Sequence, residues 1–434
     1  MTEAADPLSK RRIAVVGGGI AGLSAAYFLS PRHHVTLFEA EPRLGGHART
    51  VRAGRDGLPV DTGFIIFNKP NYPHLWTLFE RLDIPRTKSE MSFSVSLDNG
   101  GFEYALKPTG ALRGILAQPR NGLDPRYWRL FRDILRFNSN AEETAQDPGQ
   151  SLSNLLAELG TGDWFRDRFL LPLTGAIWSV PTERALDFPA QSLIRFLANH
   201  GLLSHRDHPQ WYTVAGGAEV YVSRLGALLQ RQGVELRTAA PVTRITRSPE
   251  QVEICVDGVW HGFDQVVFAL HADQILPILD APSVAEHRAL SAIRFQKNPA
   301  VLHSDPIAMP KRRTAWASWN FLGRSVPSNG TLSMTYWMNA LQTGLPRSQP
   351  MFVSLNPDFP IAPEQIHDQV TFAHPVFDLA AERARHELAD LNGTDCTWYC
   401  GAWMRNGFHE DGIASAAQVA RGLGAKHQDL GSAN

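Results

Sequence analysis

Apolar positions near the start of the chain are grouped as in one β-α-β unit. Residues 13–16 are all apolar, which is typical of a strand buried on both faces of a parallel sheet. A glycine-rich turn follows, and the apolar run over 23–29 predicts a helix that ends before Ser30 and Pro31. A second run over 34–38 predicts the next strand, which ends at Glu39. We therefore expect strand, turn, helix and strand in that order.

The rest of the chain mixes helical and strand periods. Helices are expected over 76–82, 124–138, 216–231 and 412–423, and strands over 234–236, 242–247, 252–256, 265–270 and 396–400. The apolar stretch 169–180 contains Pro172 and Gly175, which argue against a long helix. The order of these elements predicts one domain built from 1–75, 210–275 and 390–434. The intervening pieces, 76–209 and 276–389, would form a second domain.

The first turn carries the spacing of a phosphate cradle. Gly17 permits the tight turn, Gly19 lets the backbone approach a pyrophosphate, and Gly22 lets the helix pack closely. The helix N-terminus offers free N–H groups and a partial positive charge to the phosphates. Glu39 ends the second strand, where a carboxylate can accept hydrogen bonds from ribose hydroxyls and repels a 2′-phosphate. These features favour FAD or NAD over NADP.

Further small residues favour a flavin. Gly45 and Gly46 follow Glu39 closely and would let the backbone run beside a cofactor. The segment Val60-Asp61-Thr62-Gly63-Phe64 offers a second close approach. Near the end of the chain, Asp411-Gly412 is expected to open a helix whose N-terminal dipole faces the N1–C2=O edge of a flavin. That dipole would stabilise negative charge on the reduced ring.

Composition narrows the class of protein. The chain has 434 residues, enough for about two or three domains. Its formal net charge is −1, which gives no support to nucleic-acid binding through a basic field. Three cysteines are too few for a disulfide framework and suit a reducing compartment. A run of about 18 apolar residues is missing, so we expect a cytoplasmic protein that is at most peripheral on the inner membrane face.

These motifs together resemble the flavin-containing amine oxidase and phytoene desaturase superfamily. The resemblance rests on GxGxxG, Glu39, RLGGHART, VDTGF, WYTVAGG and GFHEDGIASA, and it spans the whole chain. Three segments, VDTGFIIFNKPNYPHLWTLFERL, ALHADQIL and KNPAVLHSDPIAMPKRRTAWASWN, resemble a bacterial group of NAD/FAD-binding proteins. That group is associated with cyclopropane-type fatty-acid methyltransferases and furan-fatty-acid synthesis. The resemblance implies an α/β fold: a Rossmann-like FAD-binding domain built from discontinuous segments, with a second, mixed α+β substrate domain.

The resemblance also implies how each motif would hold FAD. Pyrophosphate would lie on Gly17, Ile20, Ala21 and Gly22, adenosine ribose on Glu39, and adenine against the backbone of Val242. The ribityl chain would run along Arg43, Gly45, Gly46 and His47, and the isoalloxazine would approach Gly63 and Phe64. Gly401, Asp411, Gly412 and Ile413 would close over ribityl and pyrimidine. Ala40, Leu44 and Thr62 are expected to bind the cofactor beside these residues.

The motif departs from the superfamily at one position. The usual Gly-Gly-Arg is Gly-Gly-His here, and Arg49 comes two residues after His47. His47 has two readings, a covalent attachment point for the flavin or a hydrogen-bonding histidine. Only the residue type supports the first reading, so we expect the second.

Three residues are candidates for catalysis beside the flavin. Lys297 is similar in position to the lysine that holds a water near flavin N5 in amine oxidases. Its context, Gln296-Lys297-Asn298-Pro299, also fits an exposed loop. His271 and His303 each follow or end an apolar run, and a core or surface histidine is the alternative for each.

Other polar clusters suggest no further chemistry. The spacing of His200, His205 and His208 matches no standard metal site, so we expect a solvated loop and no metal. Cys396 and Cys400 fall on one predicted strand and are expected to be buried thiols.

Apolar residues of the middle segments bear on the substrate. They would line a long apolar tunnel, form an interfacial patch flanked by Arg166 and Arg168, or belong to an ordinary core. The set comprises Trp164, Phe165, Phe169, Leu170, Leu171, Ile177, Trp178, Trp211 and Tyr212.

The leading hypothesis is an FAD-dependent desaturase that acts on a methyl-branched, unsaturated fatty acyl chain of a lipid. An amine oxidase that releases aldehyde and ammonia is the main alternative. A third reading is a redox-silent flavoprotein, either an isomerase or hydratase or an assembly partner of a lipid methyltransferase. The expected partners are a lipid or apolar small molecule, a membrane surface and a fatty-acid methyltransferase, with no nucleic acid; the oligomeric state stays open.

Overall fold

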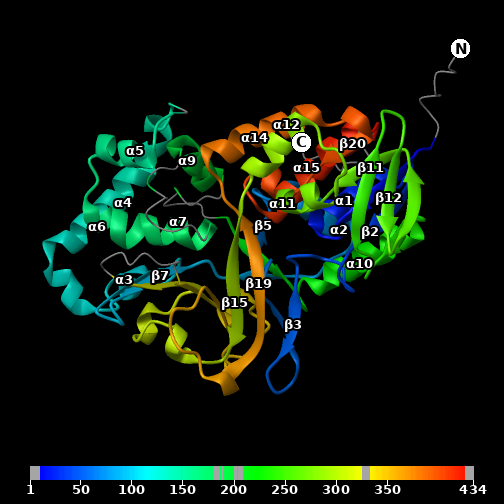
Figure 1. Ribbon diagram of the computed structural model, residues 1–434. Helices are drawn as coiled ribbons and strands as arrows, with labels where there is room; N and C mark the ends of the chain where they lie inside the picture. Colours follow the sequence, from blue (N-terminus) through cyan, green and yellow to red (C-terminus); the bar gives the residue numbers. More distant parts are fainter. Residues whose placement is uncertain are drawn as a thin grey trace, which may run out of the picture.

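A parallel sheet assembled from three distant stretches of chain forms one end of the molecule (Figure 1). The computed structural model describes residues 10–147, 149–178, 186, 189–199, 203, 209–324 and 333–425. The strand order in this sheet is β10-β2-β1-β14-β20, and every pairing is parallel. Its strands are β1 (Arg12–Val16), β2 (His34–Phe38), β10 (Glu235–Arg237), β14 (Gln265–Phe268) and β20 (Thr397–Tyr399).

Two helices from opposite ends of the chain pack together against this sheet. Helix α1 (Ile20–Leu29) follows β1, and α15 (His409–Gly422) closes the described chain. The helices can approach because Gly412 has no side chain: a Cβ there would lie 2.8 Å from Ile20 Cγ2. The helix expected over 23–29 therefore begins at Ile20, and the helix expected over 412–423 begins at His409.

A small antiparallel sheet covers the outer side of the parallel sheet. Its strands are β11 (Val242–Arg247), β12 (Val252–Val256) and β13 (Val259–Phe263). The first two match the expected bounds. Strand β13 was not predicted from the sequence, because its largely exposed residues show no apolar alternation.

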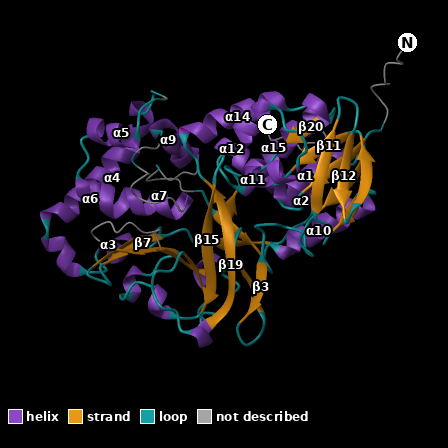
Figure 2. Ribbon diagram, viewed as in Figure 1, coloured by secondary structure: helices purple, strands orange, loops and turns teal. Residues whose placement is uncertain are grey.

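A mixed sheet of seven strands forms the second main sheet of the molecule. The long strands β15 and β19 stand in the middle of the molecule, and the helices α4, α5, α6, α7 and α9 lie to one side of them (Figure 2). The strand order is β19-β15-β18-β17-β16-β7-β8. The bounds are β7 (Phe93–Leu97), β8 (Phe102–Leu106), β15 (Phe295–His303), β16 (Trp319–Gly323), β17 (Ser333–Trp337), β18 (Phe352–Leu355) and β19 (Ile366–Pro375). This architecture confirms the expected fold class, whereas the domain boundaries stay a prediction.

The other described elements connect these layers. The helices are α2 (Pro73–Arg81), α3 (Ala111–Ile115), α4 (Pro125–Thr144), α5 (Leu152–Leu159), α6 (Asp163–Phe165), α7 (Leu171–Trp178), α9 (Ala190–Asn199), α10 (Glu219–Arg231), α11 (Ala272–Ile275), α12 (Val284–Ala292), α13 (Met338–Leu341) and α14 (Leu379–Leu391). The strands are β3 (Thr50–Ala53), β4 (Leu58–Asp61), β5 (Phe67–Asn68), β6 (Arg86–Ser89) and β9 (Trp211–Val214).

The apolar stretch from residue 169 is helical, which corrects the expectation drawn from Pro172 and Gly175. A π-helical turn over Arg166–Leu170 leads directly into α7. Pro172 is the second residue of α7, directly after the π-helical turn. Burial of Phe169 and Leu170 in the core stabilises the helix despite the local sequence.

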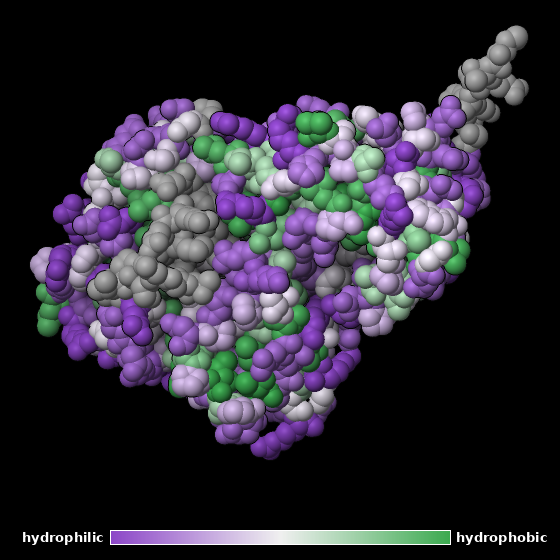
Figure 3. Space-filling view, viewed as in Figure 1, coloured by the Kyte–Doolittle hydropathy of each residue, from purple (hydrophilic) through white to green (hydrophobic). Residues whose placement is uncertain are grey.

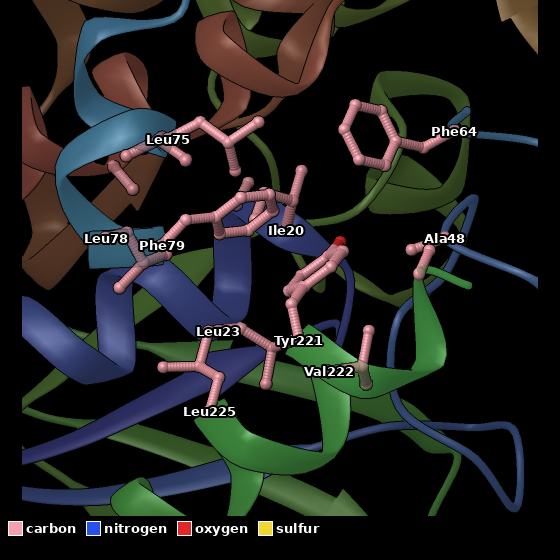
Figure 4. Close-up of a cluster of buried hydrophobic side chains, with 14 of the residues drawn as sticks. Ile20, Leu23, Ala48, Phe64, Leu75, Leu78, Phe79, Tyr221, Val222 and Leu225 are labelled. Atoms are coloured by element: carbon pink, nitrogen blue, oxygen red, sulfur yellow. The ribbon is translucent and has the colours of Figure 1, made fainter. Parts of the chain in front are cut away.

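The core around α1 brings helices and loops to one place. Side chains of α1, α2 and α10 point toward one another beside Phe64 (Figure 4). The rings of Phe79 and Tyr221 lie 5.2 Å apart, and Phe64 meets the edge of Tyr221 at 6.2 Å. The ring contacts of Phe64 with Tyr221 and with His409 fix Phe64 next to the N-terminus of α15.

On the surface, hydrophilic residues are the commonest on the face shown in Figure 3.

Candidate cofactor and substrate cavity

One large cavity, of about 1720 Å³, lies between the parallel sheet and the seven-stranded sheet. Residues that follow four of the parallel strands line it: Gly17 after β1, Glu39 after β2, Ala269 after β14 and Gly401 after β20. The carboxyl ends of parallel strands are the usual position of a nucleotide site in such sheets.

The first glycine turn is shaped as an open cradle. Gly17 has φ +111° and donates its N–H to the Phe38 carbonyl at 2.8 Å. A Cβ at Gly22 would lie 1.8 Å from the Gly17 oxygen, so Gly22 lets the helix fold tightly against the turn. A Cβ at Gly19 would meet nothing within 4 Å, because this position faces the cavity. The turn therefore leaves space in front of the N-terminus of α1.

The second glycine pair runs directly beside this cradle. Gly45 donates its N–H to the Gly18 carbonyl at 2.8 Å, and a Cβ at Gly46 would lie 3.2 Å from the Gly19 Cα. Glu39 lines the cavity next to them, and its Oε2 accepts the Gly18 N–H at 2.6 Å. Two segments that the sequence separates therefore form one backbone-lined groove.

The structure places most of the predicted cofactor residues on the cavity wall. Those that line it are Gly17, Gly19, Ile20, Ala21, Glu39, Ala40, Arg43, Gly45, Gly46, His47, Thr62, Gly63, Phe64, Val242 and Gly401. Those that do not line it are Gly22, Leu44, Asp411, Gly412 and Ile413.

The residues of α15 hold the helix in place instead of lining the cavity. Asp411 accepts the Phe408 N–H at 2.9 Å and caps the helix, and burial raises the pKa of its carboxyl to about 6. Ile413 is fully buried in the core. The cavity wall at this end is formed by His409, the first residue of α15, whose ring stacks on Phe64 at 3.8 Å.

Four histidines, which we call the cavity histidines, share this wall: His47, His271, His374 and His409. The ring centre of His47 lies 5.4 Å from that of His271 and 5.8 Å from that of His374. Burial, and then the neighbouring imidazole, lowers the pKa to about 4 for His47, His271 and His374 and to about 3 for His409. The cluster is therefore uncharged at neutral pH.

His47 also carries a buried polar atom that the protein leaves open. Its ring stacks on Phe372 at 4.9 Å, and its Nε2 has no hydrogen-bond partner among the described residues. Arg49, two residues on, forms an ion pair with Asp368 at 2.5 Å. The arginine charge is therefore already matched, whereas His47 presents a free nitrogen in the cavity.

The cavity histidines should make the free energy of unfolding depend on pH. Because folding lowers their pKa values below 6.5, the unfolded chain binds more protons between pH 4 and 6.5, and their contribution to stability is lost as the pH falls through that window. We expect His374→Gln to reduce the slope of this free energy against pH by up to about 1.4 kcal/mol per pH unit. Urea unfolding at a series of pH values measures it.

One control variant and one opposing effect bear on the comparison between wild type and His374→Gln. Burial raises the pKa of Asp61 to about 7 and that of Asp411 to about 6, so these carboxyls act in the opposite direction, equally in both proteins. His386→Gln, on the exposed face of α14, should leave the slope as in the wild type. Equal slopes for wild type and His374→Gln would contradict the prediction.

Two of the three candidate catalytic residues, Lys297 and His303, lie away from the cavity. Lys297 pairs with Ala373 in the β15–β19 register, and strand alternation turns it away from the face of Phe372 and His374. Its side chain is exposed. His303 is buried at the far end of β15, where its Nε2 bonds to Ser354 Oγ at 2.9 Å. His271 does line the cavity, stacked on Phe295 at 4.5 Å.

A second arm of the cavity runs under the seven-stranded sheet and is mostly apolar. Its lining includes Met91, Phe93, Leu106, Ile115, Trp128, Phe131, Ile134, Leu135, Phe169, Leu173, Trp319, Tyr336, Leu355, Val370 and Phe372. Glu90 and Lys107 are the charged groups of this arm among the described residues. Burial lowers the pKa of Lys107, and the charge of Glu90 opposes that shift.

Four of the nine apolar residues singled out from the sequence belong to the core. Phe165, Leu170 and Leu171 are buried, and Tyr212 packs beside the first core, whereas Phe169 and Trp211 line the cavity. Trp164 stacks under the guanidinium of Arg168 at 4.4 Å, so the patch expected around it is not open. The side chains of Ile177 and Trp178 lie outside the described residues.

The cysteines and the histidines considered as metal ligands were also placed by the sequence. Cys396 and Cys400 are buried free thiols as expected, but they flank β20 instead of lying on it. Among the described residues, no group of three or more His, Cys, Asp or Glu side chains is arranged to hold a metal ion. His200, His205 and His208 lie outside the described residues.

Sequence reasoning missed His374, Glu90 and Lys107. They come from β19 and from the segments around β6 and β8, and only strand pairing brings them to the cavity. The motif GFHEDG already contained His409, but the residue was not singled out.

The hydrogen-bonding groups on the cavity wall fit a flavin nucleotide. The open Gly19 position, the N-terminus of α1, the carboxylate of Glu39 and the unpartnered His47 Nε2 form a continuous wall of hydrogen-bonding groups. A parallel-sheet nucleotide cradle that opens into an apolar arm under a second sheet is the arrangement expected of the flavoprotein class.

Comparison with known proteins agrees with this class. The profile of the family described as flavin containing amine oxidoreductase matches residues 20–302, more than half of the chain. The chain belongs to this family.

Relatives in sequence share mainly a short segment. An L-amino-acid oxidase from Pseudechis australis is 52% identical over 54 residues, which is 12% of this chain and 10% of that protein. A protoporphyrinogen oxidase from Bos taurus is 26% identical over 323 residues, covering 65% of this chain and 64% of its own length. The chain thus matches about a tenth of the length of the first relative and under two thirds of the second.

Solved structures share the whole fold. A CLA-producing fatty acid isomerase from P. acnes has a TM-score of 0.68 at 17% identity, covering 96% of this chain and 99% of that one. A putrescine oxidase variant has a TM-score of 0.67 at 16% identity, covering 95% and 98%. At these identities the likeness concerns the fold alone.

Proposed function

We propose that the protein removes hydrogen from a methyl-branched, unsaturated fatty acyl chain of a lipid. The observation that carries the proposal is the apolar arm of the cavity, whose aliphatic and aromatic side chains match a hydrocarbon chain. An ammonium group in this arm would need an unmatched carboxylate as its partner, and the charge of Glu90 is opposed by the nearby Lys107.

The proposed reaction forms a second double bond next to the first. A C–H bond beside an alkene is cleaved as hydride, and a proton leaves from the adjacent carbon, so that a diene is formed. When bound, FAD supplies the two-electron acceptor, and dioxygen is the final oxidant. The methyl branch and the alkene stabilise the positive charge that develops on the chain.

The protein's own groups have two tasks in this scheme. The apolar arm excludes water and orients the chain, which lowers the entropy cost of reaching the reactive geometry. The neutral imidazoles of His47, His271 and His374 can each accept the proton that leaves, because their lowered pKa values keep them unprotonated at neutral pH.

Anaerobic bleaching of the flavin tests the proposal. We expect a methyl-branched, unsaturated phospholipid to bleach the visible absorption of the purified holoprotein, and putrescine and cyclohexylamine to leave it unchanged. Bleaching by the amines without bleaching by the lipid would replace the proposal with an amine oxidase.

A substitution in the apolar arm should discriminate by chain length. Ile134 is buried on α4 and lines the arm, so Ile134→Trp would fill it. We expect kcat/KM for long acyl chains to fall by about 10-fold or more, with short-chain analogues changed less than about twofold. Ile134→Val, which leaves the arm open, is the matched control. Equal losses for long and short chains would place the substrate elsewhere.

A fatty acid isomerase is the second candidate, because the P. acnes isomerase shares the fold over 96% of this chain. That activity moves a double bond without net oxidation. It predicts a product of unchanged mass with no oxygen consumption, whereas the desaturase predicts a product two hydrogens lighter.

A further inference from the structure

Exposed apolar side chains gather on one short stretch of the surface. Four of the nine large hydrophobic residues that are exposed in the described chain lie within residues 112–135. They are Leu112 (66% exposed), Leu123 (86%), Trp128 (48%) and Leu135 (52%), and we call them the apolar rim. Grouped exposed apolar residues mark an interaction site more often than scattered ones do.

The rim belongs to α3, α4 and the turn between them, at the end of the view in Figure 1 opposite the parallel sheet. Asp124 caps α4 by accepting the Arg126 N–H at 2.9 Å, and α4 then buries a face that includes Tyr127, Leu130 and Ile134. Trp128 and Leu135 are seven residues apart and lie on its outer face. Trp128 and Leu135 therefore form the unburied side of a helix whose other side packs in the core.

The rim also borders the mouth of the substrate arm. Trp128 and Leu135 are about half exposed, yet both line the cavity. Lys107, Pro108 and Thr109 line it beside them. A continuous apolar path therefore leads from the exposed rim into the arm.

The surface around the rim is strongly basic. Residues 107–140 contain seven basic and two acidic residues, a net charge of +5 in a chain whose total is −1. Of the two carboxylates, Asp124 is engaged by Arg126 at 2.7 Å, and Asp133 is buried. The basic residues are Lys107, Arg113, Arg120, Arg126, Arg129, Arg132 and Arg136.

Basic side chains around exposed leucine and tryptophan are the chemistry of binding in the headgroup layer of an anionic bilayer. Among the described residues, no helix is long and apolar enough to cross a membrane, so contact through this face would be superficial. A soluble protein partner would not explain why the apolar path continues into the cavity.

We propose that the apolar rim docks on the surface of an anionic phospholipid bilayer, with Leu112 and Leu123 inserted among the headgroups. Arg113 and Arg132 then contact lipid phosphates, and Lys107 stands at the entrance of the arm. The further step, in which an acyl chain enters the arm from the bilayer, rests on the proposed function.

Sedimentation with vesicles tests the docking without any turnover. We expect the holoprotein to bind phosphatidylglycerol vesicles at least about 10-fold more tightly than phosphatidylcholine vesicles. Adding about 0.5 M NaCl should weaken the binding, because salt at that level screens charges that lie more than a few ångströms apart. The double variant Leu112→Glu/Leu123→Glu should lose at least about 10-fold in affinity for phosphatidylglycerol. Neither Leu112 nor Leu123 lines the cavity. The flavin content of the double variant and its turnover of detergent-dispersed substrate should therefore stay at the wild-type level.

Matched variants make the result specific. Val259 and Trp260 on β13 are also exposed apolar residues, at 56% and 43%. Val259→Glu/Trp260→Glu should change vesicle binding less than about twofold. Arg113→Glu/Arg132→Glu should weaken it as much as the leucine pair does, which keeps the test valid if the leucine variant misfolds.

Three results would overturn the proposal. They are a wild-type protein that ignores phosphatidylglycerol vesicles, equal losses in the β13 control, or a dimer in sedimentation velocity that the Leu112→Glu/Leu123→Glu variant dissociates, which would assign the rim to a second copy of the chain. If vesicles bind but no lipid bleaches the flavin, the docking stands and the proposed substrate fails.

Discussion

Gly19→Asp is expected to weaken FAD binding by more than about 100-fold while leaving the folded apoprotein intact. The position faces the cavity, and a Cβ there meets nothing within 4 Å, so an aspartate fits. As the N-cap residue of α1, an aspartate can also accept a helical N–H. Its carboxylate would then occupy the pyrophosphate position and repel it. Flavin absorbance after purification and titration of apoprotein with FAD measure the loss.

Two further variants separate charge from fold. Gly19→Asn has the same size without the charge and should retain more FAD than Gly19→Asp does. Gly22→Ala should instead destabilise the apoprotein, because its Cβ would lie 1.8 Å from the Gly17 oxygen. Wild-type flavin content in Gly19→Asp would show that the nucleotide is not held at this turn.

Arg247→Met is expected to destabilise the protein by about 3–5 kcal/mol, because it leaves a buried carboxylate without its partner. Arg247 and Glu286 are 4% and 7% exposed, and their closest atoms lie 2.5 Å apart. Tyr399 also donates its hydroxyl to Glu286. With Tyr399, the pair joins β11, α12 and β20. Chemical denaturation measures the loss.

A surface pair of the same strand is the control. Arg244 contacts Asp280 at 2.8 Å but is 62% exposed, so Arg244→Met should cost less than about 1 kcal/mol. Burial alone would raise the pKa of Glu286, but hydrogen bonds from Arg247 and Tyr399 outweigh it and lower the pKa to about 2. The pair's contribution is therefore complete above pH 4.5 and is lost as the pH falls through 2. Equal losses in both variants would contradict the assignment.

Local sequence was sufficient to predict a structural element wherever the contacts that form it join residues close together in the chain. The cradle needs only a strand, three glycines and a helix start within eleven residues, and the structure forms it from Arg12 to Gly22. The same holds for β2 and for the antiparallel strands β11 and β12, whose apolar patterns gave their bounds. In each case the physical constraint acts between residues close in the chain.

Lys297 and His303 show where this reasoning ends. A resemblance to amine oxidases suggested catalysis for Lys297, and an apolar run suggested it for His303. The register of β15 against β19 turns Lys297 outward and places His303 at the far end of β15. The same register brings His374 to His47, which no local pattern indicated. A shift of one residue would exchange the faces, so the site depends on a pairing between distant segments.

The amino-acid sequence by itself determined the nucleotide cradle, because glycine spacing and the acidic strand end act between adjoining residues. The resemblance of several motifs along the chain indicated the family and the cofactor. Only the tertiary structure decided which histidines share the cavity, which apolar residues line its arm rather than the core, and which remain exposed on the rim. Those properties depend on side chains from β6, β8, β19 and α4, which become neighbours only when the long strands pair and the helices pack.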